Sequence, residues 1–254
     1  GGNSEDCYPV AHAQETHHNM TSLQTRTPAV NLPEQDRAAF VIRVYQHVLA
    51  AVVAFVAIEA LFFMTGVAES IYDMTWGSGG GGRWLLMLGV FMVGQWFVNQ
   101  AVSDLDNPAR QYAGLFGSAA IYAVIFAPFL WYVYNVKNSS STVASAAIVT
   151  AIGFALLSFV AFTTRKDLSF MRPLVMWGFG GAMLMIIASV LFGWNLGTWF
   201  SVAMVGLSGA AILYQTQNII RNFPANAHVA AAVQLFGSVM TMFWYILRIF
   251  ASRD

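Results

Sequence analysis

The feature that most constrains this chain is the recurrence of apolar runs long enough to cross a bilayer. A helix needs about 20 mainly apolar residues to span the hydrocarbon core. The sequence offers seven such runs, which we place at residues 40–66, 84–103, 112–134, 143–163, 173–193, 196–217 and 228–250. Only 9% of the residues are charged, against about 25% in a typical soluble domain. The sequence therefore predicts an all-α, multi-pass membrane protein folded as a seven-helix bundle.

The first 36 residues are polar and lack apolar periodicity, so we expect a mobile tail (1–36) ahead of a membrane domain (37–254). Its stretch "HAQETHH" and the chain's single cysteine, Cys7, do not complete a metal-ligand set, so a solvated tail is favoured over a metal site. Gly1 and Met20 both remain open as the true start.

Basic residues in the connecting segments predict the orientation, because they collect on the cytoplasmic side. One side of the predicted bundle carries Arg26, Arg37, Arg43, Arg110, Arg165, Lys166, Arg172 and Arg221, and the other carries Arg83, Lys137 and Arg253. We therefore expect the N-terminus in the cytoplasm and the C-terminus on the opposite side of the membrane. The net charge is zero, which gives no case for nucleic-acid binding.

Ionisable side chains within the spans are few, and each is costly in lipid unless it is paired or hydrated. Glu59 lies in the outer half of the first span and Arg248 in the outer part of the last. Their similar depth permits an ion pair. The alternative is that Glu59 faces a watery vestibule while Arg248 extends to the membrane surface.

Neutral polar side chains form a second group, at the predicted cytoplasmic ends of three spans. If their faces converge, they form a polar pocket open to the cytoplasm; the alternative, which we favour, is hydrogen bonding between helices, worth about 0.6 kcal/mol per contact. The pocket residues would be Gln95, Asn99, Tyr214, Gln217 and Gln234.

Small residues spaced four apart predict close approach of helices. The pairs are Gly114 with Ser118, Gly178 with Ala182, and Gly206 with Ala210. Simple packing explains them, and no function follows.

Signatures of catalysis and of cofactors are missing from the sequence. It has no HExxH and no His–carboxylate–Ser set at matching depth. A retinal Schiff base needs a lysine in the last span, whereas Lys137 and Lys166 both lie in predicted loops. We expect neither an enzyme nor a resident cofactor or metal.

Four stretches, in order along residues 38–250, are "FVIRVYQHVLAAVVAFVA", "FALLSFVAFTTRKDLSFM", "ILYQTQNII" and "AAAVQLFGSVMTMFWYILRIF". Together they resemble the Bax inhibitor-1 family, and most closely its bacterial members. The resemblance implies an inner-membrane protein with six spans around the seventh. It also implies either passive calcium leak or, as in some bacterial members, restraint of a membrane-anchored AAA protease.

Ion-conducting members of the family have a pH-dependent gate, and the residues that form it are replaced in this chain. In ion-conducting members, two close aspartates share a proton and act as a pH-dependent latch. The corresponding positions here are Gln215 and Ser238, and neither titrates. We expect that they can still form a hydrogen bond, without pH gating and without the carboxylates that calcium prefers. Arg248 does match the basic residue near the end of the family's last span.

Two hypotheses follow. In the first, the chain is a leak pathway for calcium or other cations that lacks the latch. In the second, it is a non-conducting regulator or accessory subunit of another membrane protein or complex. Flux through proteoliposomes separates them.

Overall fold

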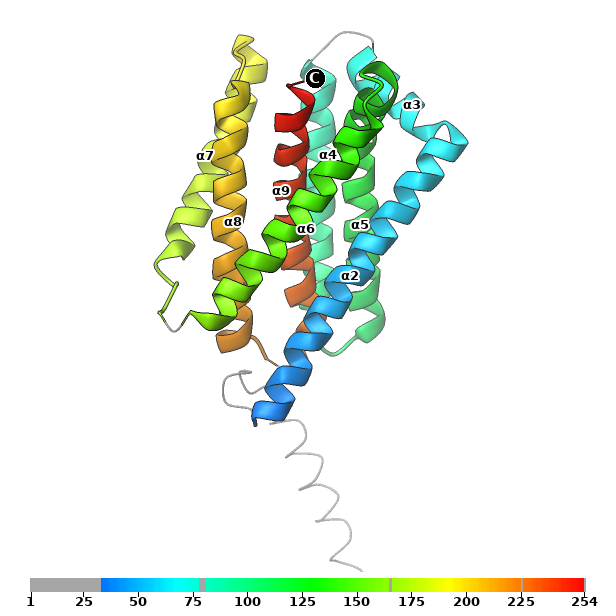
Figure 1. Cartoon of the computed structure of the whole chain (residues 1–254). Helices are drawn as coiled ribbons and strands as arrows, with labels where there is room; N and C mark the ends of the chain where they lie inside the picture. The colour runs from blue at the N-terminus through cyan, green and yellow to red at the C-terminus, as the bar shows by residue number, and fades with distance from the viewer. Residues whose placement is uncertain (1–32, 78–80, 165, 225, 254) are drawn as a thin grey trace, which may run out of the picture.

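Seven long helices form the membrane domain of this computed structural model, which describes residues 33–77, 81–164, 166–224 and 226–253. They are α2 (Glu34–Thr65), α4 (Gly81–Ser103), α5 (Pro108–Trp131), α6 (Ser140–Thr163), α7 (Met171–Phe192), α8 (Gly197–Asn222) and α9 (His228–Ala251) (Figure 1). Each is long and apolar enough to cross a bilayer. The predicted all-α bundle of seven spans is confirmed. The tail predicted at 1–36 lies, up to residue 32, outside the described residues.

Local sequence explains where several helices begin and end. Asn107 caps α5, because its Oδ1 accepts the backbone N–H of Arg110 at 3.2 Å, and Pro108 occupies the first turn. Gly66 ends α2 in the left-handed conformation, with φ 77°. The short helix α3 (Val67–Tyr72) and the π-helical turn η2 (Asp73–Gly77) follow it, and a second such turn, η3 (Tyr132–Val136), extends α5.

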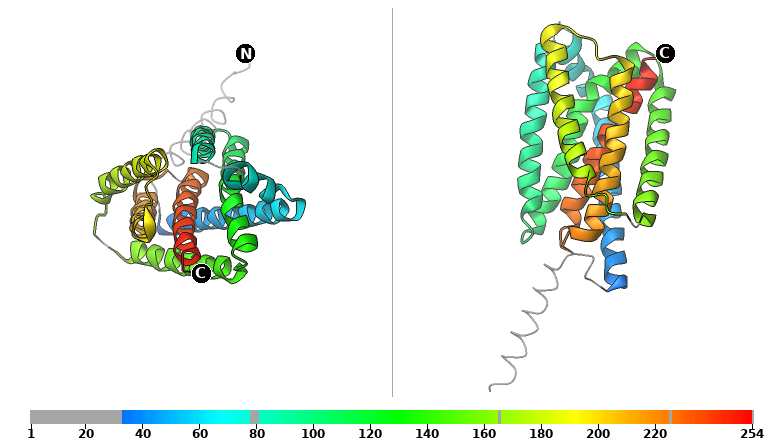
Figure 2. Two further views of the ribbon diagram at one scale, coloured as in Figure 1. Left: turned by 90° about the horizontal axis from the view of Figure 1, so that it is seen from above. Right: turned by 90° about the vertical axis from the view of Figure 1, so that its left-hand side faces the viewer.

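The most deeply buried spans are α9 and α5, with 72% and 67% of their apolar windows buried, whereas no other span exceeds 39%. Helix α9 packs against α2, α4, α5, α6 and α8, and α7 packs chiefly against α8. Seen from above, α7 and α8 lie on one side of α9 and α5 lies on the other (Figure 2). That all six other spans surround α9, as the family resemblance implies, stays a prediction.

Close helix contacts occur at two of the three predicted small-residue pairs. A Cβ atom on Gly114 would lie 2.6 Å from Val102 of α4, and one on Gly178 would lie 2.6 Å from Leu207 of α8. Both distances are too short for a real side chain, so these glycines allow the helices to touch. The prediction is wrong for Gly206, where nothing lies within 4 Å of such an atom.

Candidate functional site

The two positions that replace the family's aspartates lie side by side. Ser238 of α9 donates a hydrogen bond from Oγ to Oε1 of Gln215 on α8, at 2.9 Å. Ser238 is buried and Gln215 is half-buried. The expected hydrogen bond between them is therefore present, and it joins α8 to α9 without any charge.

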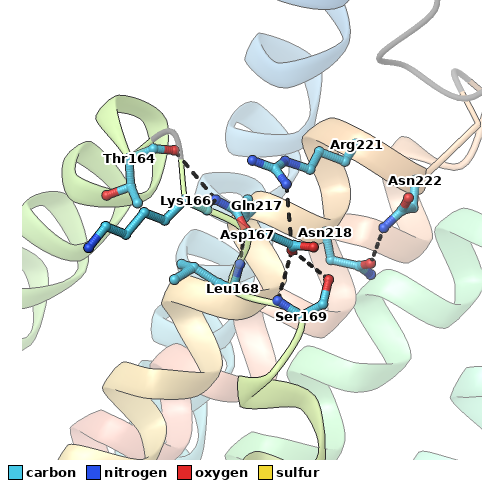
Figure 3. Close-up of polar contacts among 9 residues, drawn as sticks. All are labelled: Thr164, Lys166, Asp167, Leu168, Ser169, Gln217, Asn218, Arg221 and Asn222. Carbon is cyan, nitrogen blue, oxygen red and sulfur yellow. Dashed lines mark hydrogen bonds and ion pairs between the residues drawn. The ribbon is translucent and has the colours of Figure 1, made fainter.

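Gln217, two residues further along α8, binds the loop between α6 and α7. Its Oε1 accepts the backbone N–H of Leu168 at 2.7 Å, and its Nε2 donates to the carbonyls of Lys166, at 2.7 Å, and Thr164, at 3.4 Å (Figure 3). Gln217 is 5% exposed. One amide therefore satisfies both a donor and acceptors of the loop backbone, which anchors the loop to α8.

Asp167 adds a second attachment at the same loop (Figure 3). Its Oδ1 accepts hydrogen bonds from the hydroxyl of Ser169 at 2.6 Å and from the Ser169 backbone N–H at 2.9 Å. Arg221 of α8 lies 3.5 Å from the same oxygen. The Ser169 donors, with a smaller contribution from the Arg221 charge, hold the pKa of the Asp167 carboxyl below its ordinary value.

The five side chains predicted to form a polar pocket do not line one cavity. Gln217 alone among them borders either cavity described here, the smaller one of about 540 Å³ beside Arg37 and Arg221. Asn99 and Gln234 are exposed, and Tyr214 is half-buried. The Gln95 amide nitrogen is buried without a hydrogen-bond partner among the described residues.

The structure does not bring Glu59 and Arg248 together. Glu59 is 6% exposed, and neither carboxylate oxygen has a hydrogen-bond partner within the described part of the chain. Arg248 instead borders a larger cavity, to which α2 contributes no lining residue. Among the described residues, no three His, Cys, Asp or Glu side chains gather as metal ligands would.

The larger cavity, of about 820 Å³, was not anticipated from the sequence. Side chains of α4, α5, α7, α8 and α9, of η2 and of the α7–α8 turn line it. Its wall is aromatic: Trp84 stacks on Trp244 with ring centroids 5.7 Å apart, and Phe126 and Phe129 each approach Trp244 to 4.9 Å. The sequence feature that could have indicated this cavity is the clustering of Trp and Phe in the outer halves of several spans.

Comparison with known proteins gives a match along nearly all of the membrane domain. A family model described as "inhibitor of apoptosis-promoting Bax1" matches residues 37–254. An uncharacterized protein of Pseudomonas aeruginosa is 32% identical over 149 residues, which are 58% of this chain and 66% of that protein. The protein of Escherichia coli K12 named "Modulator of FtsH protease YccA" is 32% identical over 144 residues, 53% of this chain and 65% of that protein.

An uncharacterized membrane protein of Vibrio cholerae is 26% identical over 145 residues, covering 54% of this chain and 59% of that protein. The aligned part of the chain thus spans slightly less than two thirds of these relatives.

Proposed function

This chain belongs to the Bax inhibitor-1 family, and from that membership we propose that it is a non-conducting regulator that binds another membrane protein. The observation that carries the proposal is the hydrogen bond between Gln215 and Ser238. It occupies the positions where the ion-conducting members have a titratable latch. A neutral hydrogen bond at this point holds α8 against α9. Because neither side chain titrates, a change in pH would not break this contact.

The chemistry near these positions also favours a regulator over a channel for divalent cations. Calcium binds through several oxygen ligands, usually with carboxylates among them. Gln215 and Ser238 offer neutral oxygens that already bond each other. The neighbouring amide of Gln217 is likewise occupied, by the loop backbone.

The class of partner is proposed from a relative. The E. coli protein is named a modulator of the FtsH protease, and we propose a membrane-bound protease as the partner of this chain. The contact would involve the α6–α7 loop, because Gln217 and Arg221 hold it against α8 and a preorganised surface loses little entropy on binding. An inner-membrane location with a cytoplasmic N-terminus places this loop in the cytoplasm, and that orientation stays a prediction.

A second candidate function, a cation leak, is favoured by Glu59. A buried carboxylate inside a membrane span is costly, so it marks a functional site unless the fold pairs it. Both oxygens of Glu59 lack a partner among the described residues. A pathway passing this residue would be independent of the Gln215–Ser238 pair, and it would conduct at every pH that leaves Glu59 charged.

Calcium-indicator flux in proteoliposomes at two pH values tests both candidates. For a regulator, flux through the chain equals that of protein-free liposomes, and crosslinking in native membranes followed by purification recovers a membrane protease. Flux that Glu59→Gln abolishes, and that the exposed control Glu69→Gln leaves intact, would establish the leak instead. The double variant Gln215→Asp/Ser238→Asp adds a titratable pair, so pH-dependent flux in that variant alone would show that a pathway exists and is closed here.

A further inference from the structure

The lining of the larger cavity includes the C-terminal half of α9 and the α7–α8 turn. Figure 1 shows the C-terminus and this turn at the same end of the bundle. On α9 its lining extends from Met240 to Arg248, roughly 12 Å at about 1.5 Å per residue. On α7 it extends from Phe179 to Val190. The lining therefore extends along the helix axes, which is the direction in which lipid chains lie.

The walls of the cavity suit hydrocarbon. The stacked pair Trp84 and Trp244 lines the cavity together with apolar side chains such as Met183, Ile186 and Met204. A volume of about 820 Å³ lies within the range of roughly 300–1,000 Å³ that holds small ligands, and such sites use mainly apolar walls with a few polar groups.

Four short polar side chains in the lining are already bonded to the backbone. The hydroxyls of Thr75, Ser189 and Thr241 each donate to a backbone carbonyl three or four residues earlier, at 2.7–2.8 Å. The Asn195 side-chain oxygen accepts the backbone N–H of Gly197 at 3.0 Å. These groups therefore offer little to a polar ligand along the length of the cavity.

Arg248 is different, because among the described residues it is the one in the lining with a formal charge. It is half-buried in the last turn of α9 and has no acidic partner within the described part of the chain. Its planar guanidinium carries five donors that match a phosphate group. The end of a spanning helix also lies near the depth of lipid phosphates.

From the aromatic walls, the lining that extends along the helix axes and the cation at one end, we propose that this cavity binds an anionic phospholipid of the surrounding bilayer. An acyl chain lies along Trp84 and Trp244, and the phosphate contacts Arg248. A water-soluble ligand of this size would need more polar contacts than the lining provides. The binding does not depend on the proposed regulatory function, so each can fail separately.

The test is native mass spectrometry of the purified full chain, incubated with equal amounts of phosphatidylglycerol and phosphatidylcholine that have identical acyl chains. One retained phosphatidylglycerol per chain is expected, preferred at least about tenfold over phosphatidylcholine. Both lipids offer a phosphate to Arg248, but the positively charged choline of phosphatidylcholine opposes the guanidinium, whereas the neutral glycerol of phosphatidylglycerol does not. Arg248→Gln brings the preference close to one, and Arg248→Lys leaves an intermediate preference. Ser189→Phe narrows the cavity and lowers retention of both lipids.

The matched control is Arg253→Gln, which removes an exposed arginine at the same end of the bundle and leaves the preference unchanged. The proposal is overturned if Arg248→Gln keeps the wild-type preference while its thermal unfolding matches that of wild type. It is also overturned if Arg253→Gln lowers the preference as much, or if free palmitate displaces phosphatidylglycerol at equal concentration.

Discussion

Replacing Gln217 with methionine tests how the α6–α7 loop is held. Methionine has a similar length and volume but cannot form the two 2.7 Å hydrogen bonds to Leu168 and Lys166. The third contact, at 3.4 Å to Thr164, is too long to contribute much. Each good bond contributes about 0.5–1.5 kcal/mol net, so the docked loop loses roughly 1–3 kcal/mol and opens about 5- to 150-fold more often.

Hydrogen exchange measures this opening directly, because the Leu168 amide donates to Gln217 and exchanges when the loop leaves α8. We expect the exchange of that amide to accelerate by the same factor in Gln217→Met. The matched control is Asn218→Met at the neighbouring position, since Asn218 bonds Asn222 and not the loop. The reasoning is refuted if Leu168 exchanges at the wild-type rate in Gln217→Met, or if Asn218→Met accelerates it equally.

Three further predictions concern other parts of the molecule. The lowered pKa of Asp167 means that its contribution to loop stability is complete above the ordinary Asp pKa of about 3.9 and is lost as pH falls through the lowered value. Loop exchange, corrected for its intrinsic rate, is therefore flat from about pH 5 to 8 and rises below about pH 4, and Asp167→Asn removes that rise. Gly114→Ala lowers the free energy of unfolding by about 1–3 kcal/mol because its Cβ would lie 2.6 Å from α4, whereas Gly206→Ala, with open space, does not lower it; chemical denaturation in detergent compares them. Glu59→Gln raises the thermal unfolding temperature, because it replaces a buried carboxylate without a partner among the described residues by a neutral group; an unchanged or lower temperature would indicate that Glu59 has a partner.

The fold was predictable because membrane spans depend on properties that a sequence displays directly. Length and hydropathy locate each helix. The structure begins α5 at Pro108, after the cap Asn107, and ends α7 at Phe192, before Gly193. One boundary difference has a simple cause. Helix α8 continues to Asn222, beyond the predicted end at residue 217, because its polar last turns leave the apolar core while their backbone remains helical.

The side-chain contacts were not predictable in the same way, because they depend on the rotation of each helix about its axis. Successive residues are about 100° apart on a helix, so Gln215 and Gln217 point roughly 200° apart. The structure uses both directions: Gln215 meets α9 and Gln217 meets the α6–α7 loop. A single pocket that gathered the polar residues of this stretch was therefore geometrically disfavoured, although the sequence alone places those residues together.

The contacts on these two faces of α8 also determine how the helix responds to pH. One face is joined to α9 by a hydroxyl and an amide, and the other is joined to the loop by an amide and backbone groups. None of these groups titrates between about pH 5 and 8. Asp167 is the titratable side chain among these loop contacts, and its lowered pKa keeps it charged throughout that range. Asp substitutions at Gln215 and Ser238 would place two close carboxylates on the α9 side, and α8 would then gain a pH response on that face alone.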